Sequence, residues 1–166
     1  MTEPIERIPP EAGWRIATKG LTGALTATDK ALKEAIGQEK YNEFNGQLWY
    51  RAGKAVKELI DAFEIPVGDA REIEEALELV VRASMGPEFE FEVVEATRER
   101  CVVRTLKCAW YERYKEQGID WDFCSVGHER WGNGAVESVN PDFTFRLPNT
   151  MPRGEPYCEI IIERKR

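Results

Sequence analysis

Histidine is nearly absent from this sequence, and long apolar runs are missing. Its 166 residues include a single histidine, His128, and four cysteines. No stretch approaches the ~18 consecutive apolar residues of a membrane-spanning helix. The N-terminal Met-Thr-Glu-Pro-Ile-Glu-Arg lacks the apolar core of a signal peptide. We therefore expect a cytoplasmic protein with no membrane partner.

Basic residues are also fewer than acidic ones. There are 23 lysines and arginines against 30 aspartates and glutamates, a formal net charge of −7. Such a chain repels nucleic-acid phosphates, so no nucleic-acid partner is expected. The basic run Arg164-Lys165-Arg166 is too short for a binding arm and is typical of a solvated tail.

Familiar catalytic and metal-binding signatures are missing as well. There is no Gly-x-Ser-x-Gly nucleophile elbow, and the Gly132-Asn-Gly134 segment has no lysine-serine pair after it. No close Cys-x-x-Cys pair of the zinc-finger type occurs. Internal repeats are lacking, and the length fits one domain. Any chemistry must therefore come from residues that are distant in sequence.

Apolar residues of the first half recur at helical spacing. Residues 1–20, which contain several prolines, are expected to form an irregular leader, and a single α+β domain then spans 21–166. Its helical part covers 21–86, where apolar residues recur every three or four positions. The first helix face comprises Leu21, Ala24, Leu25, Thr28, Leu32, Ala35 and Ile36.

Glycines and one aspartate mark the predicted helix ends. Gly37 is placed to end the first helix and Gly86 the third. Asp69 is the predicted N-cap of the third helix, with Glu72 three residues on in a variant of the capping box. The acidic run from Glu72 to Glu78 is interpreted as a solvated helix face.

The periodicity changes in the cysteine-bearing region 87–166. Two helices are predicted between the strand pairs, at 108–118 and 125–139. The sequence therefore predicts an α+β fold, with N-terminal helices packed on a mostly antiparallel four-stranded sheet. The strands, expected from two-residue alternation, are 88–93, 100–107, 143–147 and 157–164.

All four cysteines and the histidine lie in this second region. Cys108 is expected at a strand-to-helix junction and Cys124 just before the next helix, where helix N-termini favour thiolates. His128 follows Cys124 by four residues, so the two should share a helix face. Cys158 would join them if its strand pairs beside the strand of Cys101.

Two interpretations of these residues stay open. Cys108, Cys124, Cys158 and His128 form a nitrogen–sulfur ligand set suited to zinc. Alternatively, the cysteines are small buried residues of the core, as cysteines often are.

Other candidates lie close to Cys124 in the sequence. Asp122 is a candidate general base or orienting group, with loop solvation as the alternative. Trp121 and Trp131 are the tryptophans expected to line a pocket, whereas Trp49 and Trp110 fit apolar core stripes.

Several motifs together suggest a family. The first half holds Gly-Leu-Thr-Gly-Ala-Leu, Ile-Gly-Gln-Glu and Leu48-Trp49. The second half holds Arg-Cys-Val-Val-Arg, Lys-Cys108, Phe-Cys124-x-x-Gly127, Asn-Pro141, Met-Pro-x-Gly154 and Tyr-Cys158-Glu. From Leu21 to about Ile162 the chain resembles the L-2-amino-thiazoline-4-carboxylic acid hydrolase family, especially its uncharacterised branch. It is distantly similar to vinyl-reductase-type, nitric-oxide-signalling and Golgi-transport ligand-binding domains.

The resemblance implies an α+β domain with a ligand or metal pocket lined by Cys108, Cys124 and Cys158. It implies hydrolysis of a non-peptide C–N bond in a small cyclic amidine or thiazoline-type substrate. In this hydrolase hypothesis, water on bound zinc or a thiolate from Cys124 or Cys108 would attack, and His128, or Asp122 in second place, would move the proton.

The rival hypothesis is a non-catalytic, sensor-like domain. It would hold a structural zinc ion or a small apolar ligand.

The chain departs from active-type members of the family at two places. It carries Val126-Gly127-His128 where an acidic residue often follows the middle cysteine, and Cys101 is an additional cysteine. In either case the expected partner is a small molecule, and exposed tryptophan-rich helix faces would favour a homodimer.

Overall fold

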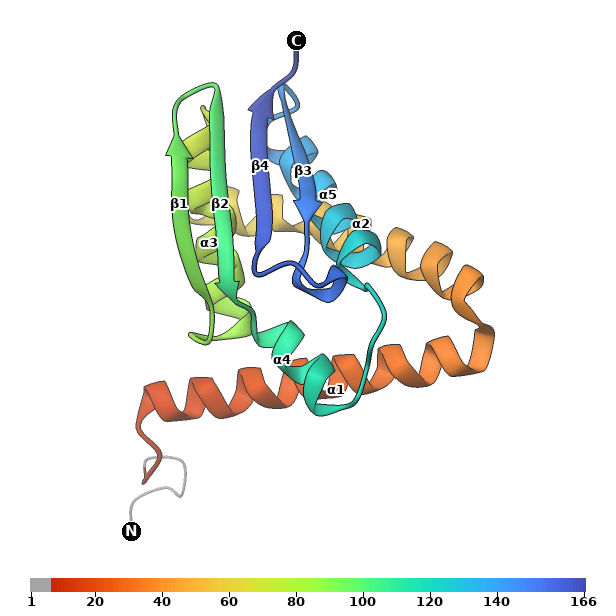
Figure 1. Ribbon diagram of the computed structural model, residues 1–166. Helices are drawn as coiled ribbons and strands as arrows, with labels where there is room; N and C mark the ends of the chain where they lie inside the picture. Colours follow the sequence, from red (N-terminus) through yellow and green to blue (C-terminus); the bar gives the residue numbers. More distant parts are fainter. Residues whose placement is uncertain (1–6) are drawn as a thin grey trace.

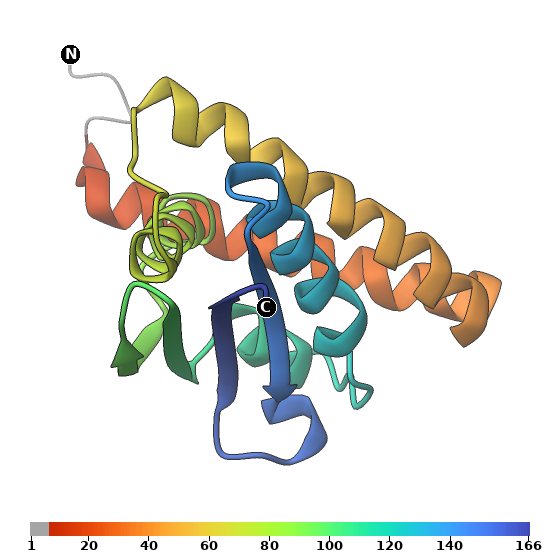
Figure 2. The same cartoon turned by 90° about the horizontal axis from the view of Figure 1, so that it is seen from above.

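A computed structural model describes residues 7–166 and shows helices gathered on one side of an antiparallel sheet (Figures 1 and 2). Within these residues, no helix combines the length and apolar character needed to cross a bilayer. The elements in chain order are α1 (Pro10–Ile36), α2 (Gln38–Ala62), α3 (Ala70–Met85), β1 (Glu90–Ala96), β2 (Arg100–Lys107), α4 (Ala109–Glu116), the π-helical turn η2 (Cys124–His128), α5 (Glu129–Val139), β3 (Phe143–Asn149), the 3₁₀ turn η3 (Met151–Arg153) and β4 (Cys158–Arg164).

The sheet has the strand order β1-β2-β4-β3, and every neighbouring pair is antiparallel. The α+β class, the hairpin and the two helices between strand pairs are confirmed. Strand β4 pairs with β2, so Cys158 lies opposite Thr105 and Ile162 opposite Cys101. The strand of Cys158 therefore pairs beside the strand of Cys101, which is the condition for Cys158 to join the other cysteines.

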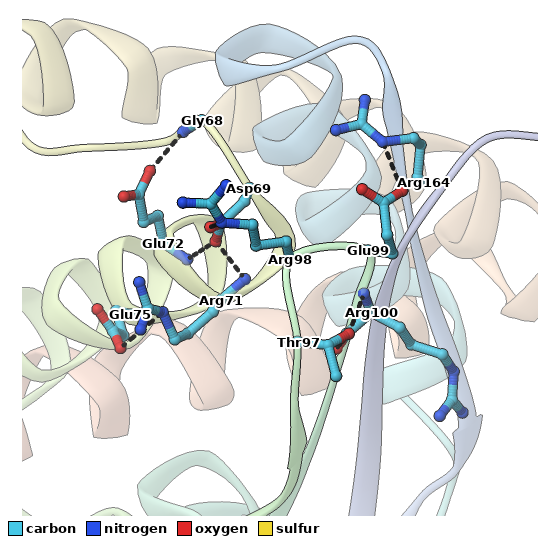
Figure 3. Close-up of polar contacts among 10 residues, drawn as sticks. All are labelled: Gly68, Asp69, Arg71, Glu72, Glu75, Thr97, Arg98, Glu99, Arg100 and Arg164. Carbon is cyan, nitrogen blue, oxygen red and sulfur yellow. Dashed lines mark hydrogen bonds and ion pairs between the residues drawn. The ribbon is translucent and has the colours of Figure 1, made fainter.

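The predicted N-cap of α3 is confirmed, and it ties this helix to the β1–β2 turn (Figure 3). The Asp69 carboxylate accepts the N–H groups of Arg71 and Glu72 at 3.1 and 3.0 Å. Glu72 accepts the N–H of Gly68 at 2.8 Å. The Ala70 N–H donates to the Arg98 carbonyl at 2.9 Å. The start of α3 is thus held by side-chain and backbone contacts together.

Helix α1 differs from the prediction in extent and in its buried face. It begins at Pro10, which is compatible with the first turn of a helix, so part of the predicted leader is helical; residues 1–6 lie outside the described residues. The predicted apolar face is only partly covered: Leu25, Leu32 and Ile36 are half-buried, whereas Leu21 is 45% exposed. The side chains that α1 buries are polar, and they are Thr18, Thr22, Thr26 and Asp29.

The polar face of α1 is buried because α4 supplies polar partners. Gln117, at the end of α4, donates to the Thr26 hydroxyl and to the Gly23 carbonyl. The Tyr114 hydroxyl donates to the Asp29 carboxylate. Periodicity alone does not reveal such partners, since they come from a helix far along the chain.

Helices α2 and α5 approach closely at glycines. A Cβ on Gly53 would lie 2.1 Å from the Trp131 carbonyl oxygen, and one on Gly134 would lie 2.2 Å from the Tyr50 carbonyl oxygen. Glycines that weaken a helix by propensity therefore allow the tight packing that brings α5 and η2 against α2.

Candidate functional site

A pocket of about 380 Å³ lies between the helices and the sheet. Most of its lining is apolar and comes from α2, α3, α5 and the strands, including Val56, Leu77, Phe89, Phe145 and Ile160. Small-molecule sites commonly have about 300–1,000 Å³, an apolar lining and a few polar groups. The polar or titratable lining side chains are Asp29, Asn45, Glu74, Glu78, Ser84, Thr105, Cys108, Tyr114, Cys124, His128 and Cys158.

The structure brings four of the sequence-predicted residues to this pocket. Cys108 enters from the N-cap of α4, Cys124 and His128 from the two ends of η2, and Cys158 from the start of β4. Cys101 does not line the pocket; it is 2% exposed within the core.

The turn that carries Cys124 and His128 is not the α-helix expected over 125–139. Residues Cys124–His128 form a π-helical turn, and α5 begins only at Glu129. Single π turns occur frequently at functional sites. Gly127 lies inside the turn, and a Cβ there would sit 3.2 Å from Trp49, so glycine lets α2 approach it.

Asp122 lies outside the pocket lining and holds the start of η2. One carboxylate oxygen accepts the Ser125 N–H at 3.1 Å, and the other pairs with Arg153 of η3 at 2.5 Å. In this arrangement Asp122 fixes the turn that positions Cys124, through a backbone contact and an ion pair.

The expectation that helix N-termini make thiolates of Cys108 and Cys124 is wrong. Burial raises the pKa of the Cys108 thiol to about 12, although the N–H of Tyr111 opposes this. The pKa of Cys124 is raised because its thiol donates a hydrogen bond to the Cys158 sulfur and because it is buried. For Cys108, the cost of moving a thiolate out of water exceeds what the N–H groups of Tyr111 and Trp110 at the helix terminus offset.

Cys158 has the opposite shift. The hydrogen bond from Cys124 lowers the pKa of the Cys158 thiol, with burial opposing it and the N–H of Met151 assisting. The Met151 nitrogen lies 3.3 Å from the Cys158 sulfur. Of the three pocket thiols, Cys158 is therefore the one whose thiolate is favoured.

His128 is an uncharged imidazole near neutral pH. Burial lowers its pKa to about 4. Its ring lies 6.1 Å from the Trp131 ring and 5.7 Å from the Phe145 ring, measured between centroids. A neutral imidazole can accept a proton, but the lowered pKa makes His128 a weak base.

The predicted zinc ligands share the pocket without forming a coordination shell. In the part of the chain that the structure describes, no three His, Cys, Asp or Glu side chains are grouped so as to hold a metal ion. The residues as they lie do not fit zinc, so no step through a metal follows from them.

Glu74 is a pocket residue that the sequence interpretation missed. Its side chain is 5% exposed and lines the pocket, so the solvated-face interpretation is wrong at this position. Burial, with help from Glu78 and Glu75, raises its pKa to about 7. The signal was its spacing, because Glu74 lies four residues after Ala70 and three before Leu77, both buried.

The tryptophans divide differently from the prediction. Trp131 lines the pocket, but Trp121 packs edge-on against Tyr41 and Tyr114 outside it. Trp49 and Trp110, expected in the core, line the pocket as an edge-to-face pair with centroids 5.5 Å apart.

Comparisons with known proteins relate the chain to one family and its fold to solved structures. The family model described as L-2-amino-thiazoline-4-carboxylic acid hydrolase matches residues 18–162. The comparison with curated proteins finds no match.

Two of the solved structures that share the fold illustrate it. One is the phenol-responsive sensory domain of the transcription activator PoxR with phenol, at 14% identity and a TM-score of 0.63, covering 86% of this chain and 74% of that one. The other is trafficking protein particle complex subunit 3 from Naegleria fowleri, covalently bound to palmitic acid, at 13% identity and a TM-score of 0.64. That match covers 92% of this chain and 97% of the other. At such identities the likeness shows the fold alone.

Proposed function

This chain belongs to the L-2-amino-thiazoline-4-carboxylic acid hydrolase family, and within that family we propose that it binds a small, predominantly apolar molecule. The observation that carries the proposal is the pocket of about 380 Å³ with its largely apolar lining. The structural neighbours support it, since one contains phenol and the other palmitic acid.

Aromatic rings give the pocket the means to hold a flat ligand. Phe89 and Phe91 stack with centroids 5.8 Å apart, and both line it together with the pair Trp49 and Trp110. Aromatic side chains add about 0.5–1.5 kcal/mol per ring contact beyond the area they bury. A one- or two-ring ligand thus finds both apolar surface and aromatic partners.

Tryptophan fluorescence provides a direct test, because Trp49, Trp110 and Trp131 all line the pocket. Titration with phenol and with the uncharged probe N-phenyl-1-naphthylamine is expected to give saturable changes. Ala52→Phe, which fills the pocket from α2, should abolish them. The matched Ala24→Phe, on an exposed position of α1, should not. Equal binding by both variants, or no saturation with the wild type, would refute the proposal.

Hydrolysis of a cyclic C–N bond is the second candidate function, and the thiol pair of Cys124 and Cys158 favours it. We infer that Cys158, rather than Cys124, supplies the nucleophile, because its pKa is lowered while that of Cys124 is raised. A thiolate is the reactive form of cysteine. The sulfur would bond to the amidine-like carbon as the Cys124 thiol protonates the ring nitrogen and the ring C–N bond breaks. Water would then displace the Cys158 sulfur as its thiolate, and the proton that His128 takes from this water would restore the Cys124 thiol.

The hydrolytic proposal is tested by comparing two cysteine variants. Cys158→Ser is expected to lower turnover of 2-amino-thiazolines by at least about a hundredfold, because the nucleophile is lost. Cys101→Ser, equally buried but outside the pocket, should retain most of the activity. Similar loss in both variants would show that the effect is structural.

Zinc binding by these cysteines and His128 stays a prediction, and metal content tests it. Metal analysis of protein purified without added metal, on wild type and Cys124→Ser, decides it. Stoichiometric zinc that disappears in the variant would mean that the thiols rearrange around a metal. Metal below stoichiometry in the wild type would leave the thiols as pocket groups.

A further inference from the structure

We propose that the ligand of this pocket carries a positively charged nitrogen and no carboxylate, with Glu74 as its ionic partner. The inference rests on the proposed binding function and adds the charge of the ligand. It comes from the charges that line the pocket and from which of them already have partners.

The charged side chains that line the pocket are acidic. They are Asp29, Glu74 and Glu78, and among residues 7–166 no lysine or arginine lines it. A carboxylate ligand would enter next to several acids with no cation to pair with. Because an unpaired charge in an apolar site is strongly disfavoured, such ligands are selected against.

Two of the three acids are already bound within the protein. Asp29 accepts a hydrogen bond from the Tyr114 hydroxyl. Glu78 pairs with Arg82 at 2.7 Å between its carboxylate oxygen and the arginine Nε. Arg82 also donates to the Phe89 carbonyl at 3.1 Å, so its guanidinium is engaged on both sides.

Glu74 is the acid that is left over. Its side chain is 95% buried and lines the pocket. Within residues 7–166 no hydrogen bond or ion pair involves its carboxyl group, and its oxygens are not among the fully buried atoms, so they stay reachable from the pocket. A pKa raised to about 7 by burial is the expected consequence of that missing partner. A cationic group on the ligand would supply the missing partner of Glu74.

The aromatic lining suits the same ligand. A cation is attracted to the faces of tryptophan and phenylalanine rings, and Trp49, Trp110, Phe89 and Phe91 line the pocket. The ligand class is therefore an alkylamine that carries an aromatic ring, or a cyclic amidine, since the nitrogen of both is protonated near neutral pH. If the hydrolytic activity of the family is retained, this chain should prefer a 2-amino-thiazoline without the carboxylate over one that carries it.

The test compares three probes of one shape: 2-phenylethylamine, 2-phenylethanol and 3-phenylpropionate. By tryptophan fluorescence, the amine should bind wild-type protein about tenfold more tightly than the alcohol, since a charge-assisted pair is stronger than a neutral one. The carboxylate should not bind measurably. Glu74→Gln should weaken the amine to the level of the alcohol and leave the alcohol unchanged.

The outcomes separate this inference from the proposed function. Amine and alcohol binding equally, tight carboxylate binding, or unchanged amine affinity in Glu74→Gln would overturn the inference alone. The same holds if the apolar naphthylamine probe binds and none of the three does. Failure of every probe, the naphthylamine included, would overturn the proposed function. The wild-type comparison needs no variant, so it stands even if Glu74→Gln folds poorly.

Discussion

Replacing Glu74 by glutamine is expected to change how the stability of this protein depends on pH. The side chain is 5% exposed in α3, and burial raises its carboxyl pKa from 4.5 to about 7. Below pH 4.5 the carboxyl is protonated in the folded and unfolded states. As the pH rises toward 7, the unfolded chain loses this proton first, so folding is progressively disfavoured until the folded carboxyl ionises too.

The size of the effect follows from the two pKa values. A difference between 4.5 and about 7, at about 1.4 kcal/mol per pH unit, corresponds to about 3 kcal/mol between pH 4.5 and pH 8. Glutamine has nearly the same shape and does not ionise. Any cost of burying its amide is independent of pH and cancels when the two pH values are compared.

Urea unfolding followed by tryptophan fluorescence at pH 4.5, 6 and 8 measures this. The free energy of unfolding of Glu74→Gln relative to wild type should increase by about 3 kcal/mol across the range. Glu58→Gln, at an exposed position of α2, should show a flat difference. A flat difference for Glu74→Gln as well would refute the reasoning, because it would mean that this carboxyl reaches water.

Three further outcomes are expected. Gly53→Ala should destabilise the protein by about 1–3 kcal/mol in urea unfolding, because the new Cβ would meet the Trp131 carbonyl oxygen. Gly20→Ala, with open space around it, should instead stabilise the protein by about 0.5–1 kcal/mol. Destabilisation by both substitutions would contradict the tight contact at Gly53. Asp69→Ala should cost about 1 kcal/mol through loss of the α3 cap, and no loss would show that the cap contributes nothing. The imidazole signals of His128 in proton NMR should stay constant between pH 8 and pH 5, since burial lowers its pKa to about 4; titration near 6.5 would place the ring in water.

Local features of this fold could be predicted where neighbours in sequence decide them. The α3 cap depends on Asp69 and the N–H groups two and three residues on, and Gly37 ends α1 as expected. Alternation over 100–107 marks β2, whose row of Cys101, Val103 and Thr105 is buried. Such patterns follow from backbone geometry, which repeats every 2 or 3.6 residues in any protein.

The buried face of α1 and the burial of Glu74 could not be predicted in this way. Thr26 and Asp29 are buried where Gln117 and Tyr114 of the α4 region, far along the chain, supply their polar partners. Glu74 has the helical spacing of a core position and the chemistry of a surface residue. Its surroundings, and not its own identity, decided which of the two applied.

The sequence by itself determined the α+β class, most of the element types and the candidate set of cysteines. Only the tertiary structure decided that Cys108, Cys124 and Cys158 share one pocket with His128, that the Cys158 sulfur receives the Met151 N–H, and that Asp122 stays outside. The reason is physical. Periodicity is a property of the local chain, whereas the ionisation of a thiol or carboxyl depends on how much water the whole fold removes and which partners it supplies.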